Sequence, residues 1–451
     1  MKNKKIDKTI IIRIALAVFV VFALTLALVS AVRNSGPKTL VIGWFDFPVV
    51  GVMPRVTKDF TDKTGIKVVF KNFPLEEWER EFYDNVCSPH PDYDLFVGDS
   101  QWLGYGAENN CYEDLTSVVD RNKLWGKFVN FAIDNYGEFP ANSEKYYAVP
   151  FSGNSFIYAY RKDWFENETE KKNFYNRYGY ELSYPRTVVE LRDIAEFFTR
   201  PEEGKYGIVF PTSSEYDCIT MQYGTFLFGA GGDWGDYASC DSDGHINSDR
   251  AIRTLKLFKE LKGYMPPKEA INYADVGRLF MKGDVAVMSG IAAHGFDLTD
   301  NPDYKKMNIG WFGSLYGEGG GFSQLAGQGI SISKNSSQKE LARKFIDWWI
   351  TEDTQRLFAR EGGLTLEKKA ISSNEFKDVQ PFNVAYSDSA EFMKDFWNVP
   401  SYDKLLIVSQ KNLYDYFYDK SGLSAKETLD KINEEWKTIL NNDQYCSQMT
   451  R

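Results

Sequence analysis

Residues 94–105, which read DLFVGDSQWLGY, place a carboxylate, an amide and an indole directly after a run of apolar residues. Asp99, Gln101 and Trp102 supply these three groups. A carboxylate and a primary amide offer planar sets of hydrogen-bonding atoms, and an indole offers a flat apolar face. Such a set suits a ligand that has polar groups around its edge and an apolar face. A structural role is the alternative, because Asp99 can cap the following helix and Trp102 can be a core ring.

Trp44 and Asp46 form a second pair of this kind, at the end of the first predicted strand, residues 39–44. Strands then alternate with helices, which predicts a parallel sheet covered on both faces. Ligands of such sheets bind at the carboxyl ends of the strands, where both pairs lie. The apolar periodicity predicts further strands at 66–70, 94–97, 206–210, 283–290 and 328–333, and helices at 53–64, 76–86, 185–198, 218–228, 251–261, 338–350, 389–397 and 425–440.

The length and composition favour a two-lobed protein with a neutral or small partner. A chain of 451 residues suits two lobes, each of roughly 150 to 200 residues. Its 63 acidic and 53 basic residues give a net charge of -10, which argues against a nucleic-acid-binding surface. Aromatic residues make up 16% of the chain, a surplus that fits a site with stacking rings.

The N-terminal segment, residues 1–35, predicts export. Basic residues up to Arg13 precede an almost unbroken apolar run at 14–32. This order keeps the N-terminus in the cytoplasm and moves the rest of the chain outward. The run can be an uncleaved membrane-spanning anchor, or a signal helix cleaved after Ala31, and both alternatives stay open. We therefore expect the protein at the cell surface or in the periplasm, anchored to the membrane, or secreted if cleavage occurs.

The five cysteines and three histidines of the chain decide which disulfide bridges and metal sites can be expected. Export permits disulfides, and we predict Cys87 with Cys111 and Cys218 with Cys240, with free buried thiols as the alternative. No CxxC occurs, so a zinc site is not expected. The glycine-rich segment 317–322 lacks the ending of a phosphate-binding loop, and DSDG at 241–244 lacks the glutamate of a calcium loop. We predict neither metal nor cofactor.

An ordered set of segments resembles the family 1 extracellular solute-binding proteins of ABC importers, which include maltose- and oligosaccharide-binding proteins. The resemblance covers residues 40–366. Its strongest part is FMKGDVAVM followed by a late strand and the ELARKFIDWW helix. The segments are TLVIGW at 39–44, DYDLFVGDSQWLGY at 92–105, YYAVPFSGNSFIYAYRKDWF at 146–165, FGAGGDW at 228–234, LFMKGDVAVMSG at 279–290 and GQGISISKNSSQKELARKFIDWWITEDTQ at 327–355.

The resemblance implies an α/β, two-lobed periplasmic-binding-protein-like fold of type II. The first lobe would hold residues 38–148 and 327–370, and the second would hold 149–326 and 371–451. Hinge crossings would then fall near 148–149 and 326–327. Such hinges permit open and closed states around a ligand.

The resemblance also points to ligand-binding residues in the second lobe. Asn154 matches a position just after the first crossing, and His294 matches one where relatives place a stacking aromatic. The other candidates are Tyr223, Trp234 and Trp311, with Gln324 and Gln328 near the second crossing. Tyr223 and Trp311 have a core role as their alternative.

The implied function is that of a monomeric, non-enzymatic receptor that binds a carbohydrate, an oligosaccharide or glycoside, and delivers it to a membrane permease. Sugar hydroxyls need planar polar partners, and the C–H face of a pyranose needs an aromatic ring. One alternative is a binding protein of the same fold for a non-sugar solute such as a polyamine, because Asp46 and Asp99 also suit a cation. Another is an exported glycoside hydrolase, which needs two carboxylates across a cleft.

Overall fold

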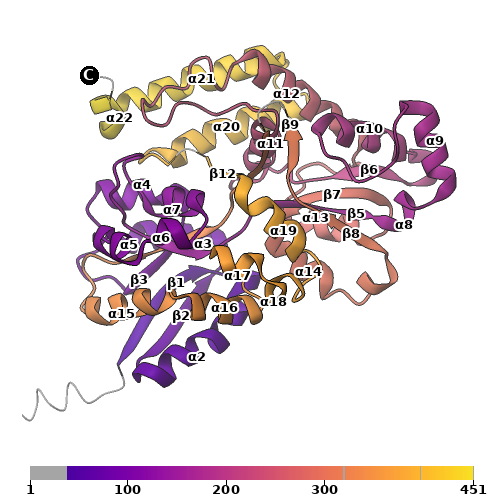
Figure 1. Cartoon of the computed structure of the whole chain (residues 1–451). Helices are drawn as coiled ribbons and strands as arrows, with labels where there is room; N and C mark the ends of the chain where they lie inside the picture. The colour runs from indigo at the N-terminus through magenta and orange to yellow at the C-terminus, as the bar shows by residue number, and fades with distance from the viewer. Residues whose placement is uncertain (1–37, 318–319, 397, 450–451) are drawn as a thin grey trace, which may run out of the picture.

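The computed structural model describes residues 38–317, 320–396 and 398–449. The predicted membrane-spanning or signal helix at the N-terminus lies outside these residues. Across the described ranges, no helix combines the length and apolar character needed to cross a bilayer. The described chain forms two α/β lobes with a set of C-terminal helices packed across them (Figure 1).

The sheet of the first lobe has five strands in the order β2-β1-β3-β11-β4. They are β1 (Thr39–Phe45), β2 (Lys67–Phe73), β3 (Leu95–Asp99), β4 (Val149–Ser152) and β11 (Gln328–Ile332). Strand β1 runs parallel to β2 and β3, whereas β11 runs antiparallel to both of its neighbours. The sheet is therefore mixed and not fully parallel as predicted, because β11 re-enters from the second lobe.

Helices cover the first sheet on both faces (Figure 1). Helix α2 ends as predicted at Gly65, whose φ of 71° is one that glycine adopts freely. The helices associated with this lobe are α2 (Met53–Thr64), α3 (Leu75–Asn85), α4 (Ser100–Glu108), α5 (Thr116–Asn122), α6 (Leu124–Lys127), α7 (Asn130–Gly137), α15 (Lys339–Trp349), α16 (Glu352–Arg360), α17 (Lys368–Ser372) and α18 (Asn374–Lys377).

The sheet of the second lobe has the order β6-β7-β5-β8. Its strands are β5 (Phe156–Arg161), β6 (Tyr206–Val209), β7 (Val285–Ile291) and β8 (Ile309–Phe312), and a smaller sheet joins β9 (Leu315–Gly317), β10 (Gly320–Gln324) and β12 (Met393–Lys394). The helices are α8 (Lys162–Phe165), α9 (Glu168–Tyr178), α10 (Val188–Phe198), α11 (Cys218–Gly229), α12 (Asp249–Glu260), α13 (Tyr273–Phe280) and α14 (Gly295–Thr299). Thr187 and Ser248 cap α10 and α12.

Of the four C-terminal helices, the last three lie across the top of the molecule in Figure 1, whereas the first lies lower, near the middle. They are α19 (Asn383–Ser389), α20 (Tyr402–Phe417), α21 (Ala425–Asn442) and α22 (Gln444–Met449). Helix α20 packs on α11 and α21, and it also contacts α4 of the first lobe. The helix predicted at 389–397 was wrong, because α19 ends at Ser389 and the short strand β12 follows, paired with β10.

The chain crosses between the two large sheets at residues 153–155 and 325–327. The first crossing comes later than the predicted 148–149, since β4 pairs with β11 in the first sheet. Glycines permit the close packing there. A Cβ at Gly153 would lie 1.9 Å from the Tyr386 hydroxyl, and one at Gly327 would lie 2.3 Å from the Tyr136 hydroxyl.

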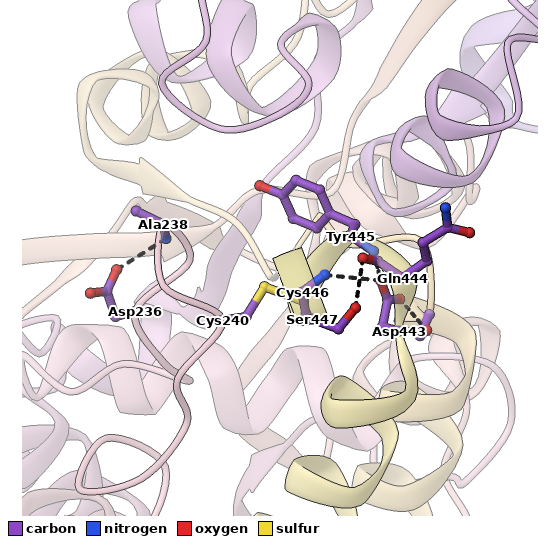
Figure 2. Close-up of a disulfide and its surroundings, with 9 residues drawn as sticks. Asp236, Ala238, Cys240, Asp443, Gln444, Tyr445, Cys446 and Ser447 are labelled. Atoms are coloured by element: carbon purple, nitrogen blue, oxygen red, sulfur yellow. Dashed lines mark hydrogen bonds between the residues drawn. A yellow bond between two sulfur atoms is a disulfide. The ribbon is translucent and has the colours of Figure 1, made fainter. Parts of the chain in front are cut away.

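The cysteines form the predicted Cys87–Cys111 bridge and a second bridge that was not predicted. Cys240 pairs with Cys446 of α22, 206 positions away (Figure 2). Cys218 is a free buried thiol. The predicted Cys218–Cys240 bridge was therefore wrong. Proximity along the chain suggested it, whereas the packing of the C-terminal helices brings Cys446 to Cys240.

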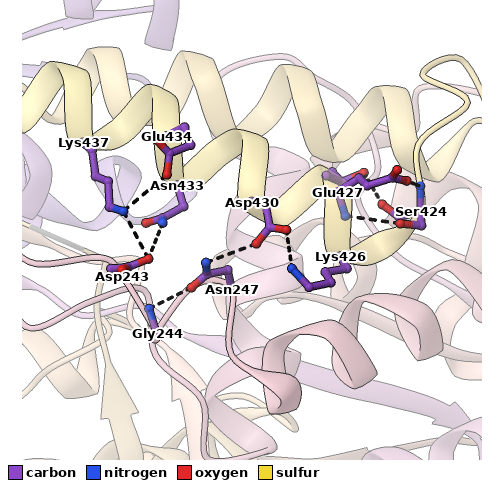
Figure 3. A network of polar contacts seen from close by, with 11 residues as sticks. Asp243, Gly244, Asn247, Ser424, Lys426, Glu427, Asp430, Asn433, Glu434 and Lys437 are labelled. Carbon is purple, nitrogen blue, oxygen red and sulfur yellow. Dashed lines mark hydrogen bonds and ion pairs between the residues drawn. The ribbon is translucent and has the colours of Figure 1, made fainter.

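Polar contacts also tie the segment around 241–247 to α21 (Figure 3). Asp243 accepts a hydrogen bond of 2.7 Å from Asn433, and Asn247 donates one of 3.2 Å to Asp430. Gly244 has a φ of 72°, as a turn requires. The DSDG sequence thus forms a turn that anchors the C-terminal helices.

Candidate functional site

A cavity of about 210 Å³ lies between the two lobes, and we call it the interlobe cavity. Both lobes and both crossings contribute to its wall, at the carboxyl ends of β1 and β3 and beside β7. The lining residues are Phe45, Asp46, Phe47, Pro48, Leu75, Asp99, Asn154, Tyr216, Asp217, Tyr273, Ile291, His294, Ala326 and Gln328.

The first lobe supplies two carboxylates and an amide. Asp46 follows β1, Asp99 ends β3, and Gln328 begins β11 directly opposite Asp99 in the strand register. Asp99 occupies the N-cap position of α4 but makes no side-chain capping bond. Its carboxylate instead accepts a hydrogen bond of 3.3 Å from the hydroxyl of Tyr216, which comes from the second lobe.

The second lobe supplies a carboxylate, two phenols and an imidazole. Asp217 precedes α11 and accepts a hydrogen bond of 2.8 Å from the hydroxyl of Tyr273. The ring of Tyr273 stacks on His294 with a centroid distance of 6.0 Å. Nδ1 of His294 lies 2.8 Å from the carboxylate of Asp297, which fixes the ring.

Three buried carboxylates, Asp99, Asp217 and Asp395, lie close to one another around this site. Burial, reinforced by the charges of Asp217 and Asp395, raises the pKa of Asp99 well above its usual range. Burial raises the pKa of Asp217 to about 6 and that of Asp395 to about 7. Removal from water disfavours the charged form of each acid, and its acidic neighbours add repulsion.

Two amides of the cavity wall hold buried atoms that have no hydrogen-bond partner: Nδ2 of Asn154 and Oε1 of Gln328. The Asn154 carbonyl oxygen accepts from the backbone N–H groups of Ser155 and Ala293, each at 3.1 Å. This orientation leaves the amide nitrogen of Asn154 as a donor. A buried polar group without a partner is costly, so these two atoms suit a polar ligand.

Four of the predicted site residues line the interlobe cavity: Asp46, Asp99, Asn154 and His294. Gln328, a candidate near the second crossing, lines it too. Gln101 lies next to them, and its Oε1, 3.1 Å from the Tyr216 hydroxyl, shares that single hydroxyl hydrogen with Asp99. Gln324 is buried behind the cavity and donates to Asp395.

The predicted tryptophans and Tyr223 do not line the interlobe cavity. Trp44 packs on Phe151, because it shares the core face of β1 with Leu40 and Ile42. Trp102 packs on Phe82 with ring centroids 4.9 Å apart.

Two of the other three rings, Trp234 and Tyr223, belong to the core, and the third, Trp311, is partly buried against it. Trp234 packs between Phe396 and Trp436, and the hydroxyl of Tyr223 donates to the backbone of Ala251. Trp311 in β8 donates to the hydroxyl of Tyr304.

Five further residues line the cavity and were not predicted from the sequence: Phe45, Phe47, Tyr216, Asp217 and Tyr273. Tyr216 and Asp217 follow β6, so the strand-end argument used for the first lobe identifies them too. Phe45 and Phe47 flank the predicted Asp46. No comparable local signal marks Tyr273, at the start of α13.

Comparisons with known proteins agree with this architecture. The sequence profile of the family described as bacterial extracellular solute-binding protein matches residues 50–356. A mannitol-binding protein of Pseudomonas aeruginosa is 25% identical over 221 residues, which are 48% of this chain and 48% of that protein. The chain therefore spans about half the length of this curated relative.

Solved structures share the two-lobed fold. An ABC transporter solute-binding protein from Agrobacterium radiobacter K84, in complex with ribitol, superposes with a TM-score of 0.71 at 20% identity, covering 89% of this chain and 98% of that one. The sugar-binding protein MalE from Xanthomonas citri gives 0.73 at 17% identity, covering 91% and 99%. The profile match extends over more than half of the sequence, and the chain belongs to the bacterial extracellular solute-binding protein family.

Proposed function

We propose that this protein is the non-enzymatic receptor of an ABC importer, and that it binds a carbohydrate in the interlobe cavity and presents it to a membrane permease. The observation that carries the proposal is the composition of the cavity wall. Carboxylates and amides from both lobes lie beside the rings of Phe45, Phe47 and Tyr273. This combination meets the needs of hydroxyl groups and of an apolar sugar face.

The names of the relatives support a carbohydrate ligand, since they bind mannitol, ribitol or sugars. The cavity volume supports a small one. At about 210 Å³ it lies below the roughly 300 to 1,000 Å³ of pockets for drug-sized ligands. We therefore favour a solute the size of one sugar ring or an alditol over the oligosaccharide expected from the sequence.

Hinge closure would trap this solute. The crossings at 153–155 and 325–327 are suited to act as hinges. The first lobe would then hold residues 38–152 and the segment that begins at residue 328. Contacts between the first lobe and the rest of the chain favour a closed form: Tyr216 with Asp99, and the N–H of Gly104 with the side chain of Asn398 at 2.9 Å. A ligand that touches both lobes would shift an open–closed equilibrium toward this form, which the permease would recognise.

We propose that the protein acts on the outer side of the cytoplasmic membrane. We also propose that it acts as a monomer. The family and the basic and apolar order of residues 1–35 support this location.

A thermal-shift screen of the purified chain tests the proposal. The panel contains monosaccharides, alditols, oligosaccharides, putrescine and spermidine. We expect at least one monosaccharide or alditol to raise the Tm in a concentration-dependent way. Stabilisation by a polyamine and by no carbohydrate would overturn the proposal. Chromatography of oligosaccharides after incubation with the protein should detect no cleavage, and products would indicate a hydrolase.

A further inference from the structure

The interlobe cavity is acidic on both sides. Asp46 and Asp99 line it from the first lobe, and Asp217 lines it from the second. Asp99 and Asp217 are buried, whereas Asp46 is exposed. No lysine or arginine occurs among the described residues that line the cavity, and its imidazole, on His294, is held by Asp297. The wall itself therefore supplies no permanent cation to compensate these carboxylates.

Neutral groups supply the side-chain hydrogen bonds that Asp99 and Asp217 accept. Asp99 accepts from the hydroxyls of Tyr216 at 3.3 Å and Ser100 at 3.4 Å. Asp217 accepts from the hydroxyl of Tyr273 at 2.8 Å. Burial and acidic neighbours disfavour the charged form of both carboxyls, and a cation bound between them favours that form because it offers each an opposite charge. A neutral ligand offers no such compensating charge, so the cavity is suited to favour a cationic ligand.

A cation alone does not satisfy the two side-chain amides of the cavity wall that have an atom without a hydrogen-bond partner. Nδ2 of Asn154 is a donor and needs an acceptor, whereas Oε1 of Gln328 is an acceptor and needs a donor. A hydroxyl group provides both functions in one small unit. The ammonium groups of a polyamine have donors only, so a polyamine leaves Asn154 without a partner.

We propose that the interlobe cavity selects a small aminated carbohydrate, an amino sugar or an amino alditol. Its ammonium group lies between Asp99 and Asp217, and its hydroxyl groups meet Asn154 and Gln328. The inference rests on the proposed carbohydrate-binding function and narrows its ligand.

Matched pairs of probes test the charge selection without altering the protein. Isothermal titration calorimetry of the purified chain at pH 7.5 compares glucosamine with glucose, galactosamine with galactose, mannosamine with mannose, and 1-amino-1-deoxysorbitol with sorbitol. A charge-assisted contact predicts that the amine binds at least about tenfold more tightly than its neutral partner in one or more pairs.

The outcomes separate this inference from the proposed function. Neutral members that bind as tightly as their amines would overturn the inference and leave the carbohydrate receptor in place. Binding of putrescine without binding of any carbohydrate, neutral or aminated, would overturn both. Failure of every amine, with a different neutral carbohydrate bound, would overturn the inference alone.

A variant locates the ammonium site. Asp217→Asn keeps the shape and removes the charge, and we expect the amine to lose about tenfold in affinity, a loss at least about threefold greater than that of its neutral partner. Asp300→Asn, at an exposed acid that does not line the cavity, is the control and should leave both affinities unchanged. Equal losses for amine and neutral partner would contradict the placement. If Asp217→Asn does not fold, Asp99→Asn takes its place with the same expectation.

Discussion

The buried carboxylates between the lobes make the folded state sensitive to pH. Asp395 is the clearest case, because it is buried and does not line the interlobe cavity. Its Oδ1 accepts hydrogen bonds from Gln324 and from the N–H of Phe396, whereas Oδ2 has no partner. Burial, together with the charge of Asp217, raises its pKa to about 7.

The variant Asp395→Asn should stabilise the protein at pH 8. A carboxyl whose pKa is raised on folding binds more protons in the folded state between about pH 4 and 7, so stability falls as pH rises through this window. The amide carries no charge, and the expected gain is about 2 kcal/mol at pH 8, fading below pH 5. Urea denaturation at pH 8 and pH 4.5 measures it. A loss of stability of the same size at both pH values would contradict this account.

The segments that cross between the lobes leave no room for a side chain at some of their positions. Gly153 lies between β4 of the first sheet and β5 of the second, and its N–H donates to Leu364 at 2.7 Å. A Cβ there would lie 1.9 Å from the Tyr386 hydroxyl and 2.8 Å from Leu366 Cγ. The backbone therefore approaches its neighbours more closely than any side chain permits.

The variant Gly153→Ala should lower the free energy of unfolding by about 1 to 3 kcal/mol, the usual cost of overpacking. Gly126→Ala is the matched control, because Gly126 lies in the short helix α6 and a Cβ there meets nothing within 4 Å. Thermal denaturation of both variants gives the comparison. Similar Tm values for the two would show that the crossing tolerates a methyl group.

On the scale of the whole molecule, the contact of Tyr216 with Asp99 and Gln101 joins the two lobes at the cavity. Tyr216 is a residue with positive φ, 39°, on the segment that precedes α11. The ring of Trp102 packs edge-on against it at 6.5 Å. In the proposed open–closed equilibrium, this contact would favour the closed arrangement even without ligand.

The variant Tyr216→Phe should shift the unliganded protein toward open forms, because it removes the hydroxyl that joins the lobes and leaves the ring in place. Small-angle X-ray scattering should show a larger radius of gyration than for the unaltered chain, and a saturating ligand should reduce the difference. Tyr175→Phe, at a half-exposed tyrosine of α9, is the control. An unchanged radius of gyration in Tyr216→Phe would argue against a role for this contact in closure.

Local patterns in the sequence determined most of the elements and one side of the cavity. Apolar periodicity and caps located α2, α10, α12 and α21 to within a few residues. Asp46 and Asp99 were found because strand ends are readable from sequence. The core position of Trp44 was also readable, because Leu40, Ile42 and Trp44 share one face of β1.

Which distant segments meet depends on the packing of the whole fold. Cys446 reaches Cys240 across 206 positions, and Tyr216, Asp217 and Tyr273 reach Asp99 from the other lobe. The sequence determined the order of the segments that match the family and the acids at the strand ends, since these depend on residues close together in the chain. The acidity and size of the cavity depend on how two lobes pack, and packing is set by surfaces that no local pattern encodes.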